Sequence, residues 1–502
     1  MKPALRLAGA VWGHLVGDAM GVPYEFRPVD RIGEVRWGES GTYAKPPGTW
    51  SDDGALMLAL LDSLLPDPWV DPPRTGGFDT SDQAERFVRW AWEQAYTPSG
   101  EGRFDIGGTT SDALRRIRDG VAAEDAGPTD ERSQGNGSLM RILPVALTVR
   151  DPVKLPELID QAHRASRVTH GHPVAQAACA LYVLLCRGLL RGETDRGFAL
   201  AEARAKLRGW YARNAPAHLV ALDAIESHEH EPHHGTGWVV DSFWSAWDAF
   251  TSAGSYAETV EKAIRYGNDT DTTACIGGGM AGIYWGIDGI PPAWLRGMRD
   301  RPQVSRLVDR LLSDAGYRTS TASPLRVDWV DGDRVPSQAA WRGRLGMLPL
   351  PGKHGIRGKA GDHWRDLDAD VAALAAAGVQ TLLLLLPDAE LEAGRAGRLP
   401  AVLAEHQIRL LRHPIPDLGV PDDHLAFRAM LMQASDELRA GRDVGVACMG
   451  GLGRTGTAVA CLLVDAGLPA EDAMSVTRAT RRRTIENDAQ VRFVSSWAIT
   501  GC

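Results

Sequence analysis

The amino-acid sequence predicts two domains of different class, an all-α domain followed by an α/β domain with a central, mainly parallel sheet. Three observations predict this arrangement. The chain has 502 residues, more than a single hydrophobic core normally organises. Apolar residues recur at three- and four-residue spacing through residues 5–312, as they do in helices that pack by one face. Beyond a polar stretch at 316–323, short apolar runs alternate with helical segments, which is typical of a parallel sheet.

The first domain is expected to be a set of helices joined by long loops rich in glycine, proline and aspartate. The helical period is clearest in five segments: 55–65, 83–95, 173–190, 198–211 and 242–250. Residues 1–22 are apolar, but His14 and Asp18 interrupt them and no small-residue cleavage site follows. We therefore interpret the start of the chain as a buried helix and not as a signal peptide.

The second domain shows alternating strand and helix signals. A short apolar run at 379–386 is closed by Pro387 and follows a helical pattern at 366–377, so we expect a buried parallel strand there. Further strands are expected at 408–413 and 444–447, and further helices at 424–440 and 457–465. We place the first domain at 1–316, a linker at 317–324 and the second domain at 325–502.

Composition argues against several classes of function. The net charge is −9 and the isoelectric point about 5.9, whereas a protein that binds nucleic acid stably presents a basic face. No stretch approaches 18 uninterrupted apolar residues, so no membrane span is expected. The six cysteines show neither disulfide nor metal spacing, which fits a reducing cytoplasm best. The His-rich segment 228–234 is interpreted as an exposed loop, with transition-metal binding as the alternative.

Two short acidic clusters far apart in the chain point to metal chemistry. One is Ser-Asp-Asp at 51–53, and the other is Asp-Thr-Asp-Thr at 269–272. Carboxylates and hydroxyls are hard oxygen ligands that suit Mg²⁺ or Mn²⁺, and two centres could share them. Apolar or small-residue runs follow at 55–65 and 274–283, so both clusters are expected in turns that open buried helices. For either cluster alone, the alternative is a helix N-cap with a solvated neighbour.

Further motifs surround the two acidic clusters, in order over roughly residues 5–300. They are Gly17-Asp18-Ala19-Met20-Gly21, Pro23-Tyr24-Glu25-Phe26, Gly135-Asn136-Gly137-Ser138-Leu139-Met140-Arg141, Thr169-His170-Gly171-His172-Pro173 and Gly235-Thr236-Gly237-Trp238-Val239-Val240. Together with the acidic clusters, this series resembles the ADP-ribosylglycohydrolase family, which includes the dinitrogenase-reductase-activating glycohydrolases.

This resemblance implies hydrolysis of the glycosidic bond between ADP-ribose and an acceptor, with two Mg²⁺ ions holding the distal ribose through its hydroxyls. The implied metal ligands are Ser51, Asp52, Asp53, Asp269, Asp271 and Thr272, of which Asp52 and Asp271 would also be catalytic. Glu25 occupies the position of a mobile carboxylate that protonates the ribose or the leaving group. The alternative for Glu25 is a surface glutamate after a Pro-Tyr turn. The acceptor is not indicated: arginine, serine, a base and a small metabolite all stay open.

The resemblance also implies a substrate-binding set. Ser133, Asn136 and Gly137 would contact the diphosphate, and His170 would line the proximal part of the pocket. Arg132 and Gln134 replace the small and aromatic residues of some relatives. A second candidate phosphate or ribose loop lies at 107–110, where the alternative is a plain turn.

A second chemical motif, Cys-x5-Arg-Thr, follows the strand expected at 444–447 and opens a helix. Its glycines, Gly450, Gly451 and Gly453, let successive backbone N–H groups point into one concavity where a phosphate dianion can bind. Arg454 can clamp that dianion, and the same field favours the thiolate form of Cys448. Thr455 can donate a hydrogen bond to the sulfur. The alternative is a glycine-rich loop with an incidental buried cysteine.

Residues from about 325 to 500 resemble the cysteine-dependent dual-specificity phosphatases, most closely the cyclin-dependent-kinase-associated branch. Leu348-Pro349-Leu350-Pro351-Gly352 and His413-Pro414-Ile415-Pro416-Asp417 carry the likeness beside the Gly-Gly-Leu-Gly-Arg loop. Asp417 would be the general acid, with Asp422 or Asp423 as alternatives. Ala447 stands where that family usually has a histidine. Arg481-Arg482-Arg483 could attract an anionic substrate or form a solvated helix face.

The sequence therefore favours a bifunctional cytoplasmic enzyme that acts on ADP-ribosylated and phosphorylated substrates. Its first domain would hydrolyse ADP-ribosyl bonds with Mg²⁺, and its second would be a thiolate phosphatase without a cofactor. The alternative makes the second domain a phosphate-binding pseudophosphatase that recruits substrates. A non-catalytic, crystallin-like first domain is disfavoured because the carboxylate set is intact.

Overall fold

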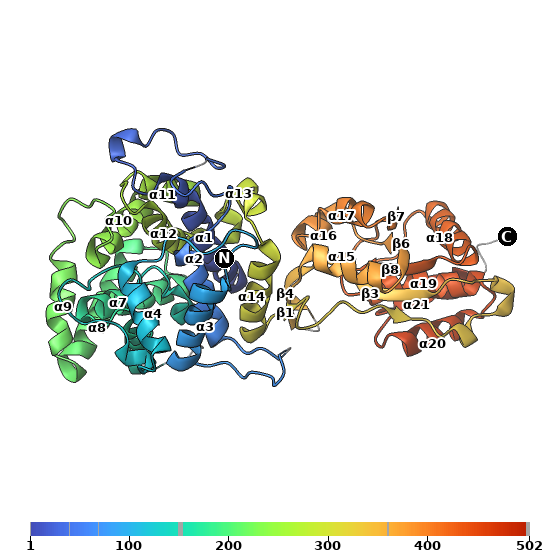
Figure 1. Ribbon diagram of the computed structural model, residues 1–502. Coiled ribbons are helices and arrows are strands. Elements are labelled where there is room, and N and C mark those ends of the chain that lie inside the picture. Colours follow the sequence, from blue (N-terminus) through green and yellow to red (C-terminus); the bar gives the residue numbers. More distant parts are fainter. Residues whose placement is uncertain (1, 40, 69, 149–153, 359–360, 498–502) are drawn as a thin grey trace. The chain divides into compact units, whose positions relative to one another are not determined.

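The structure is a computed structural model that describes residues 2–39, 41–68, 70–148, 154–358 and 361–497 (Figure 1). The chain divides into two compact units, Met1–Ala315 and Gly316–Cys502.

The first unit is helical, as predicted, and its described residues form no strand longer than an isolated bridge. Its α-helices are α1 (Pro3–Gly21), α2 (Asp52–Leu64), α3 (Thr80–Glu93), α4 (Gly108–Arg118), α5 (Leu143–Thr148), α6 (Leu155–Arg167), α7 (Pro173–Leu190), α8 (Arg196–Asn214), α9 (Ala217–Glu226), α10 (Val239–Ser252), α11 (Tyr256–Ile264), α12 (Thr270–Trp285), α13 (Pro292–Gly297) and α14 (Arg301–Asp314). All five helices predicted from periodicity are present, and the start of the chain is the buried helix α1.

Helix α7 lies in the core of this unit. Among the described residues it is the one helix long and apolar enough to cross a membrane, but 83% of it is buried inside the protein. A core helix of a globular unit meets the same length and hydropathy requirement. Its burial is therefore explained by its neighbours α6, α8 and α9, which pack against it.

Helices α1 and α12 pack against each other, and glycines of α1 face the backbone of α12 closely. Four glycines spaced four residues apart line the contacting face of α1: Gly9, Gly13, Gly17 and Gly21. A Cβ atom on Gly17 would lie 2.2 Å from the carbonyl oxygen of Ala274, and one on Gly21 would lie 2.4 Å from the Cα of Asp271. Since a larger residue could not fit, these glycines fix the position of the second acidic turn against α1.

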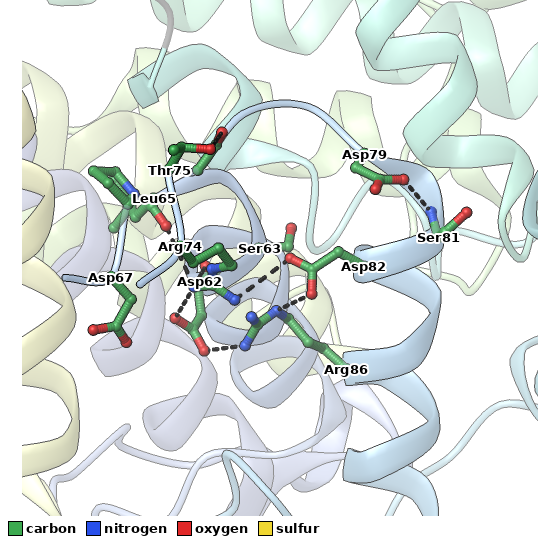
Figure 2. A network of polar contacts seen from close by, with 12 residues as sticks. Asp62, Ser63, Leu65, Asp67, Arg74, Thr75, Asp79, Ser81, Asp82 and Arg86 are labelled. Carbon is green, nitrogen blue, oxygen red and sulfur yellow. Dashed lines mark hydrogen bonds and ion pairs between the residues drawn. The ribbon is translucent and has the colours of Figure 1, made fainter. Parts of the chain in front are cut away.

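A network of charged side chains anchors the C-terminal part of α2. Figure 2 shows Asp62 of α2 between Arg74 and Arg86, with Asp82 beside both arginines. Asp62 also accepts a hydrogen bond from Arg310 of α14. Because this carboxylate and its partners are largely buried, losing one partner would leave an uncompensated charge. The network thus ties α2 to α3, to the following loop and to α14.

The second unit combines helices with two sheets. Its elements are β1 (Arg318–Thr319), β2 (Asp328–Trp329), β3 (Leu345–Pro349), β4 (His354–Gly358), β5 (Gly361–Trp364), α15 (Leu367–Ala376), β6 (Val379–Leu384), α16 (Asp388–Ala393), α17 (Leu399–Glu405), β7 (Arg409–Arg412), α18 (His424–Arg439), β8 (Asp443–Cys448), α19 (Gly453–Asp465), α20 (Ala470–Thr480) and α21 (Asp488–Trp497). The larger sheet has the order β2-β3-β8-β6-β7. Three of its four strand pairings are parallel, which confirms the predicted sheet class.

The three predicted strands correspond to β6, β7 and β8. Strand β3 and the small sheet β1-β5-β4 were not predicted. Gly346 and Pro349 lie within β3, and both are poor strand formers, so local propensity hides it. The strand forms because it pairs in parallel with β8 from Leu345 opposite Val444 to Pro349 opposite Cys448. This pairing places the end of β3 beside the predicted nucleophile.

Candidate active sites

A cavity of about 270 Å³ in the first unit is lined by residues from both predicted acidic turns. The predicted site residues that line it are Glu25, Asp52, Asp53, Asn136, Gly137, His170, Asp269 and Thr272. The candidate loop at 107–110 lines it too. Ser51, Asp271 and Ser133 lie outside this lining, and the hydroxyl of Ser133 donates to the carboxylate of Asp130 at 2.8 Å.

Both acidic turns open buried helices, as the sequence predicts. Ser51 is the N-cap of α2, where its hydroxyl accepts a hydrogen bond from the N–H of Asp53. Asp18 of α1, which is fully buried, accepts hydrogen bonds from the N–H groups of Ser51 at 2.9 Å and Gly54 at 2.7 Å. A single aspartate of α1 therefore holds the first acidic turn, while the glycines of α1 position the second.

The carboxylates form two groups of three. Glu25, Asp269 and Asp271 make one group, and Asp52, Asp53 and Asp105 make the other; within each, the oxygen atoms lie within 4.8 Å of one another. The Oε2 of Glu25 and the Oδ2 of Asp271 are buried without a hydrogen-bond partner among the described residues. Buried acceptors of this kind, in an all-oxygen set, fit a divalent cation.

Burial and mutual repulsion shift these carboxyl groups strongly. Burial, followed by the charge of Asp269, raises the pKa of Asp53 to about 7. Burial, followed by the charge of Asp105, raises the pKa of Glu25 to about 10. Like-charged groups this close cannot all ionise unless a positive charge joins them. The site therefore favours a bound cation on electrostatic grounds.

Asp105 is a member of the site that sequence patterns did not reveal. It lies in the loop before α4, where it accepts a hydrogen bond from the hydroxyl of Tyr43 at 2.5 Å. Its backbone has a positive φ of 59°, which is uncommon for a residue other than glycine. The one signal in the sequence was its place two residues before the candidate loop at 107–110.

Asn136 and His170 complete the cavity wall. The side-chain amide of Asn136 donates to Asp269 at 2.7 Å and to the hydroxyl of Ser242 at 2.9 Å, so it orients a carboxylate of the acidic turn. The Nδ1 of His170 contacts the hydroxyl of Thr169 at 2.8 Å. Burial, followed by the charge of Arg141, lowers the pKa of His170 to about 3, which keeps its ring neutral. A Cβ on Gly137 would lie 2.8 Å from that ring.

The histidines at 228–234 do not form a metal-binding group of three or more ligands within the described parts of the chain. His233 uses its Nδ1 for Asp248 at 2.7 Å and its Nε2 for the carbonyl oxygen of His228 at 2.9 Å. The ring of His233 is thus occupied in holding its own loop.

The second site lies in the second unit, at a strand–loop–helix junction. Cys448 ends β8, and α19 begins at Gly453, as the sequence predicts. Gly451 has a φ of 67°, and a Cβ there would lie 2.5 Å from the carbonyl oxygen of Leu348 in β3. Only glycine fits such a close approach with that backbone conformation. The loop at 449–452 is therefore shaped by its contact with β3.

Arg454 is nearly buried and is held from three directions. Its Nη1 donates to Glu390 of α16 and to the carbonyl oxygen of Ile415, and its Nη2 donates to Asp417, all at 2.9 Å. These bonds bring the predicted general acid, Asp417, to the predicted phosphate clamp. Asp423, one of the alternative acids, accepts a hydrogen bond from the N–H of Ala426 and caps α18.

Other contacts of the loop involve residues that the sequence patterns did not place. The N–H of Gly453 donates to Glu486 at 3.0 Å. Arg481 pairs with Asp328 and donates to the carbonyl oxygen of Gly450, so it is not a solvated charge. The hydroxyl of Thr455 is buried and has no hydrogen-bond partner among the described residues. The predicted hydrogen bond from this hydroxyl to the sulfur of Cys448 is therefore not formed.

Comparison with known proteins finds two family models, one for each part of the chain. Residues 1–320 match the family model of ADP-ribosylglycohydrolase. The chain belongs to the ADP-ribosylglycohydrolase family. Residues 364–494 match a second family model, the DSP-PTPase phosphatase domain of the Swiss Army Knife type. This ADP-ribosylglycohydrolase is therefore a hydrolase joined to a phosphatase, and its substrates are ADP-ribosylated and phosphorylated compounds.

Relatives of the first unit include enzymes with named substrates. The ADP-ribosylarginine hydrolase Tri1 of Pseudomonas putida is 28% identical over 313 residues, covering 62% of this chain and 78% of its own. The ADP-ribosyl-[dinitrogen reductase] glycohydrolase of Rhodospirillum rubrum is 29% identical, in an alignment that covers 62% of this chain and 97% of that protein. A solved structure of an ADP-ribosylglycohydrolase-related protein complex is 32% identical with a TM-score of 0.50. The alignment covers 62% of this chain and 99% of that chain.

For the second unit, a solved kinase-associated phosphatase covers 36% of this chain and 96% of its own, with 24% identity and a TM-score of 0.32. A likeness at that level carries no weight by itself. The assignment of this unit rests on the family model and on the Cys-x5-Arg junction between β8 and α19.

Proposed function

We propose that the first unit hydrolyses the bond between the anomeric carbon of ADP-ribose and a guanidine nitrogen of arginine, with two Mg²⁺ ions. The observation that carries this proposal is the meeting of two carboxylate groups, from turns far apart in the chain, around one cavity. Arginine as acceptor is supported by the relatives that act on ADP-ribosylarginine and by the acidic lining, which attracts a guanidinium.

The metal ions would be held by Asp52, Asp53, Asp269 and Asp271, with the hydroxyls of Ser51 and Thr272 beside them and Asp105 as an added ligand. Mn²⁺ has the same ligand preference and is the alternative ion. Bound there, the ions would polarise the ribose hydroxyls as Lewis acids. Asn136 contributes by keeping the Asp269 carboxylate turned toward the site.

In the proposed reaction Glu25 acts as the general acid. Its carboxyl group gives a proton to the guanidine nitrogen while the bond from that nitrogen to the anomeric carbon breaks. A water molecule then forms the new bond to the carbon and loses its proton to the Glu25 carboxylate, which restores the acid and gives free ADP-ribose and arginine. The backbone around Asn136 and Gly137 would hold the diphosphate, and the neutral ring of His170 would face the substrate without adding charge.

Calorimetry of ADP-ribose binding tests this site. We expect binding with Mg²⁺, none with excess EDTA, and none for Asp271→Ala, because that variant removes a ligand. Asp112→Ala, which changes an exposed aspartate of α4, should bind like the wild type. Equal binding with and without metal would contradict the proposal. Faster release of ADP-ribose from serine-linked than from arginine-linked peptides would overturn arginine as the acceptor and leave the proposed metal site intact.

We propose that the second unit is a thiolate phosphatase. Cys448 attacks the phosphorus of a phosphomonoester, the bond from phosphorus to the leaving oxygen breaks, and Asp417 gives that oxygen a proton. Water then hydrolyses the phosphocysteine and restores the thiolate. Arg454 and the N–H groups around Gly450, Gly451 and Gly453 would bind the phosphate, and the unpartnered hydroxyl of Thr455 is available to the sulfur.

The runner-up is a phosphate-binding module without turnover, which Ala447 in place of the usual histidine favours. Hydrolysis of p-nitrophenyl phosphate separates the two. Turnover by the wild type that is lost in Cys448→Ser supports catalysis. A wild type that binds phosphate but turns nothing over supports the module.

A reducing, cytoplasmic location and the absence of stable nucleic-acid or membrane partners belong to the same proposal. The described cysteines are all free and buried, which suits a chain whose nucleophile must stay reduced. Loss of phosphatase activity under mild oxidant, and its recovery with a thiol reductant, would support this setting.

A further inference from the structure

Two cations contact the phosphate loop from outside, at consecutive peptide groups. The ammonium of Lys353, in the turn after β3, donates to the carbonyl oxygen of Met449 at 3.3 Å. The guanidinium of Arg481, at the end of α20, donates to the carbonyl oxygen of Gly450 at 3.2 Å. The loop is thus held at the two positions that directly follow Cys448.

These two bonds dictate where the next N–H groups point. In a trans peptide the C=O and the N–H extend to opposite sides of the chain. When Lys353 fixes the carbonyl of Met449, the N–H of Gly450 is turned away from the lysine. Arg481 turns the N–H of Gly451 in the same manner. Successive N–H groups directed into one concavity are what binds an anion, so the two outer cations set up the inner cradle.

Lys353 is also unusual for its burial. The residue is only 9% exposed, whereas lysine is rarely buried without an anionic partner. Burial lowers the pKa of Lys353, and the charge of the nearby Cys448 thiolate acts in the opposite direction. Arg481 is neutralised by its ion pair with Asp328. Lys353 is therefore the cation beside Cys448 that no described ion pair offsets.

We propose that Lys353 and Arg481 are positioning residues of the phosphatase, and that Lys353 supplies the stabilisation of the Cys448 thiolate which a histidine at position 447 would otherwise give. Both cations hold the loop carbonyls, but Arg481 is paired with Asp328, so Lys353 is the one of the two that adds net positive charge near the sulfur. This inference rests on the proposed phosphatase activity of the second unit. It explains how the loop can work with Ala447.

The charged groups that face the Cys448 loop come from several elements. They are Lys353 after β3, Glu390 of α16, Asp417 before α18, Arg454 of α19, Arg481 at the end of α20 and Glu486 before α21. Arg454 is matched by Glu390 and Asp417. A change at Lys353 alone should therefore alter the charge balance at the sulfur.

The test is alkylation of Cys448 by iodoacetamide in the full-length protein as a function of pH, with Cys448→Ser giving the background from other cysteines. Only the thiolate reacts. An opposite charge close by is worth about one pH unit or more, so we expect Lys353→Met to react about tenfold more slowly near pH 6. Lys353→Arg should retain most of the wild-type rate, and Arg334→Met, at an exposed site, all of it.

Arg481→Gln separates the two roles. It should weaken binding of inorganic phosphate about fivefold, the effect of one lost hydrogen bond, and leave the pH dependence of alkylation unchanged. An unchanged alkylation profile in a folded Lys353→Met protein would overturn the proposal. If Lys353→Met does not fold, Lys353→Arg and Lys353→Gln are compared instead. Equal alkylation rates of Cys448 in these two variants would overturn the proposal, because only the arginine keeps the positive charge.

Failure of the phosphatase proposal looks different. In that case the wild type hydrolyses no p-nitrophenyl phosphate at any pH, while the alkylation difference between wild type and Lys353→Met persists. The role of Lys353 at the thiolate would then stand within a phosphate-binding module.

Discussion

The two sites of this chain use charge in opposite ways. The cavity of the first unit is lined by carboxylates, and among the described residues that line it there is neither lysine nor arginine. The loop of the second unit is surrounded by Lys353, Arg454 and Arg481, each of which already contacts a carboxylate or a carbonyl oxygen. On the proposed functions, the first site would gain its counter-charge only when a cation binds, whereas the contacts around the second loop are present without an anion.

The two sites therefore differ in how their charges bear on the stability of the folded chain. Burial, followed by the repulsion between neighbouring carboxylates, raises the pKa of Glu25 and Asp53, so on the proposed metal site cation binding and stability would be coupled. The phosphate loop is preorganised by bonds that persist without substrate, which is the arrangement expected for electrostatic catalysis.

Removing divalent metal should separate the two activities most strongly. With EDTA in excess, ADP-ribosyl hydrolysis should fall about a thousandfold or more, because several kcal/mol of charge stabilisation is lost. Hydrolysis of p-nitrophenyl phosphate by the same sample should be unchanged. Adding back Mg²⁺ should restore the first activity. A parallel loss of both activities would break the comparison.

Asp105→Asn should lower ADP-ribosyl hydrolysis by roughly 10- to 100-fold, since it removes one charge from the second carboxylate group and keeps the acceptor for Tyr43. Steady-state kinetics at saturating Mg²⁺ measures this effect. Tyr43→Phe is the matched control, and it should cost less because the carboxylate remains. If both variants behave alike, Asp105 acts only by holding the loop.

Asp271→Asn should stabilise the metal-free protein by about 1 kcal/mol, because it relieves repulsion at the functional site. The same variant should lose the rise in melting temperature that Mg²⁺ gives the wild type. Thermal unfolding with EDTA and with Mg²⁺ measures both effects. Asp112→Asn should change neither, and a metal-free Asp271→Asn protein less stable than the wild type would argue against stored repulsion.

The smallest expected effect concerns the cations around the second site. Burial, followed by the charges of Lys353 and Arg365, lowers the pKa of His363 from 6.5 to about 4. Between these values the folded unit binds fewer protons than the unfolded chain, so its free energy of unfolding falls as the pH falls. His363→Gln should flatten this dependence in melting curves, whereas His406→Gln, at an exposed position, should not.

The contiguous parts of both sites were predictable from sequence, and the dispersed parts were not. Three motifs can be recognised within a few residues of sequence, because their functional side chains lie at the start of a helix. They are the turns at 51–53 and 269–272 and the Cys448 junction. Asp105 has no acidic neighbour in the sequence, and Glu390, Glu486 and Lys353 reach the phosphate loop through tertiary contacts only. Such partners depend on packing between elements, which local pattern does not encode.

The fold shows the same division. Helices with a sustained apolar period were predicted, among them α7, whose predicted bounds agree with the structure. Strand β3 was missed because its residues favour the strand only through pairing with β8. For Ser133, the resemblance implies a diphosphate contact, and the structure adds that its hydroxyl donates to Asp130.

The glycine contact between α1 and α12 has a consequence for biosynthesis. The ribosome releases α1 and α2 first, and with them Asp52 and Asp53, but their counterpart Asp271 emerges only with α12. Until then the nascent chain holds half of a cation site. On the proposed metal site, a cation could therefore be bound fully only after α12 has been translated, while the second unit is still to be made.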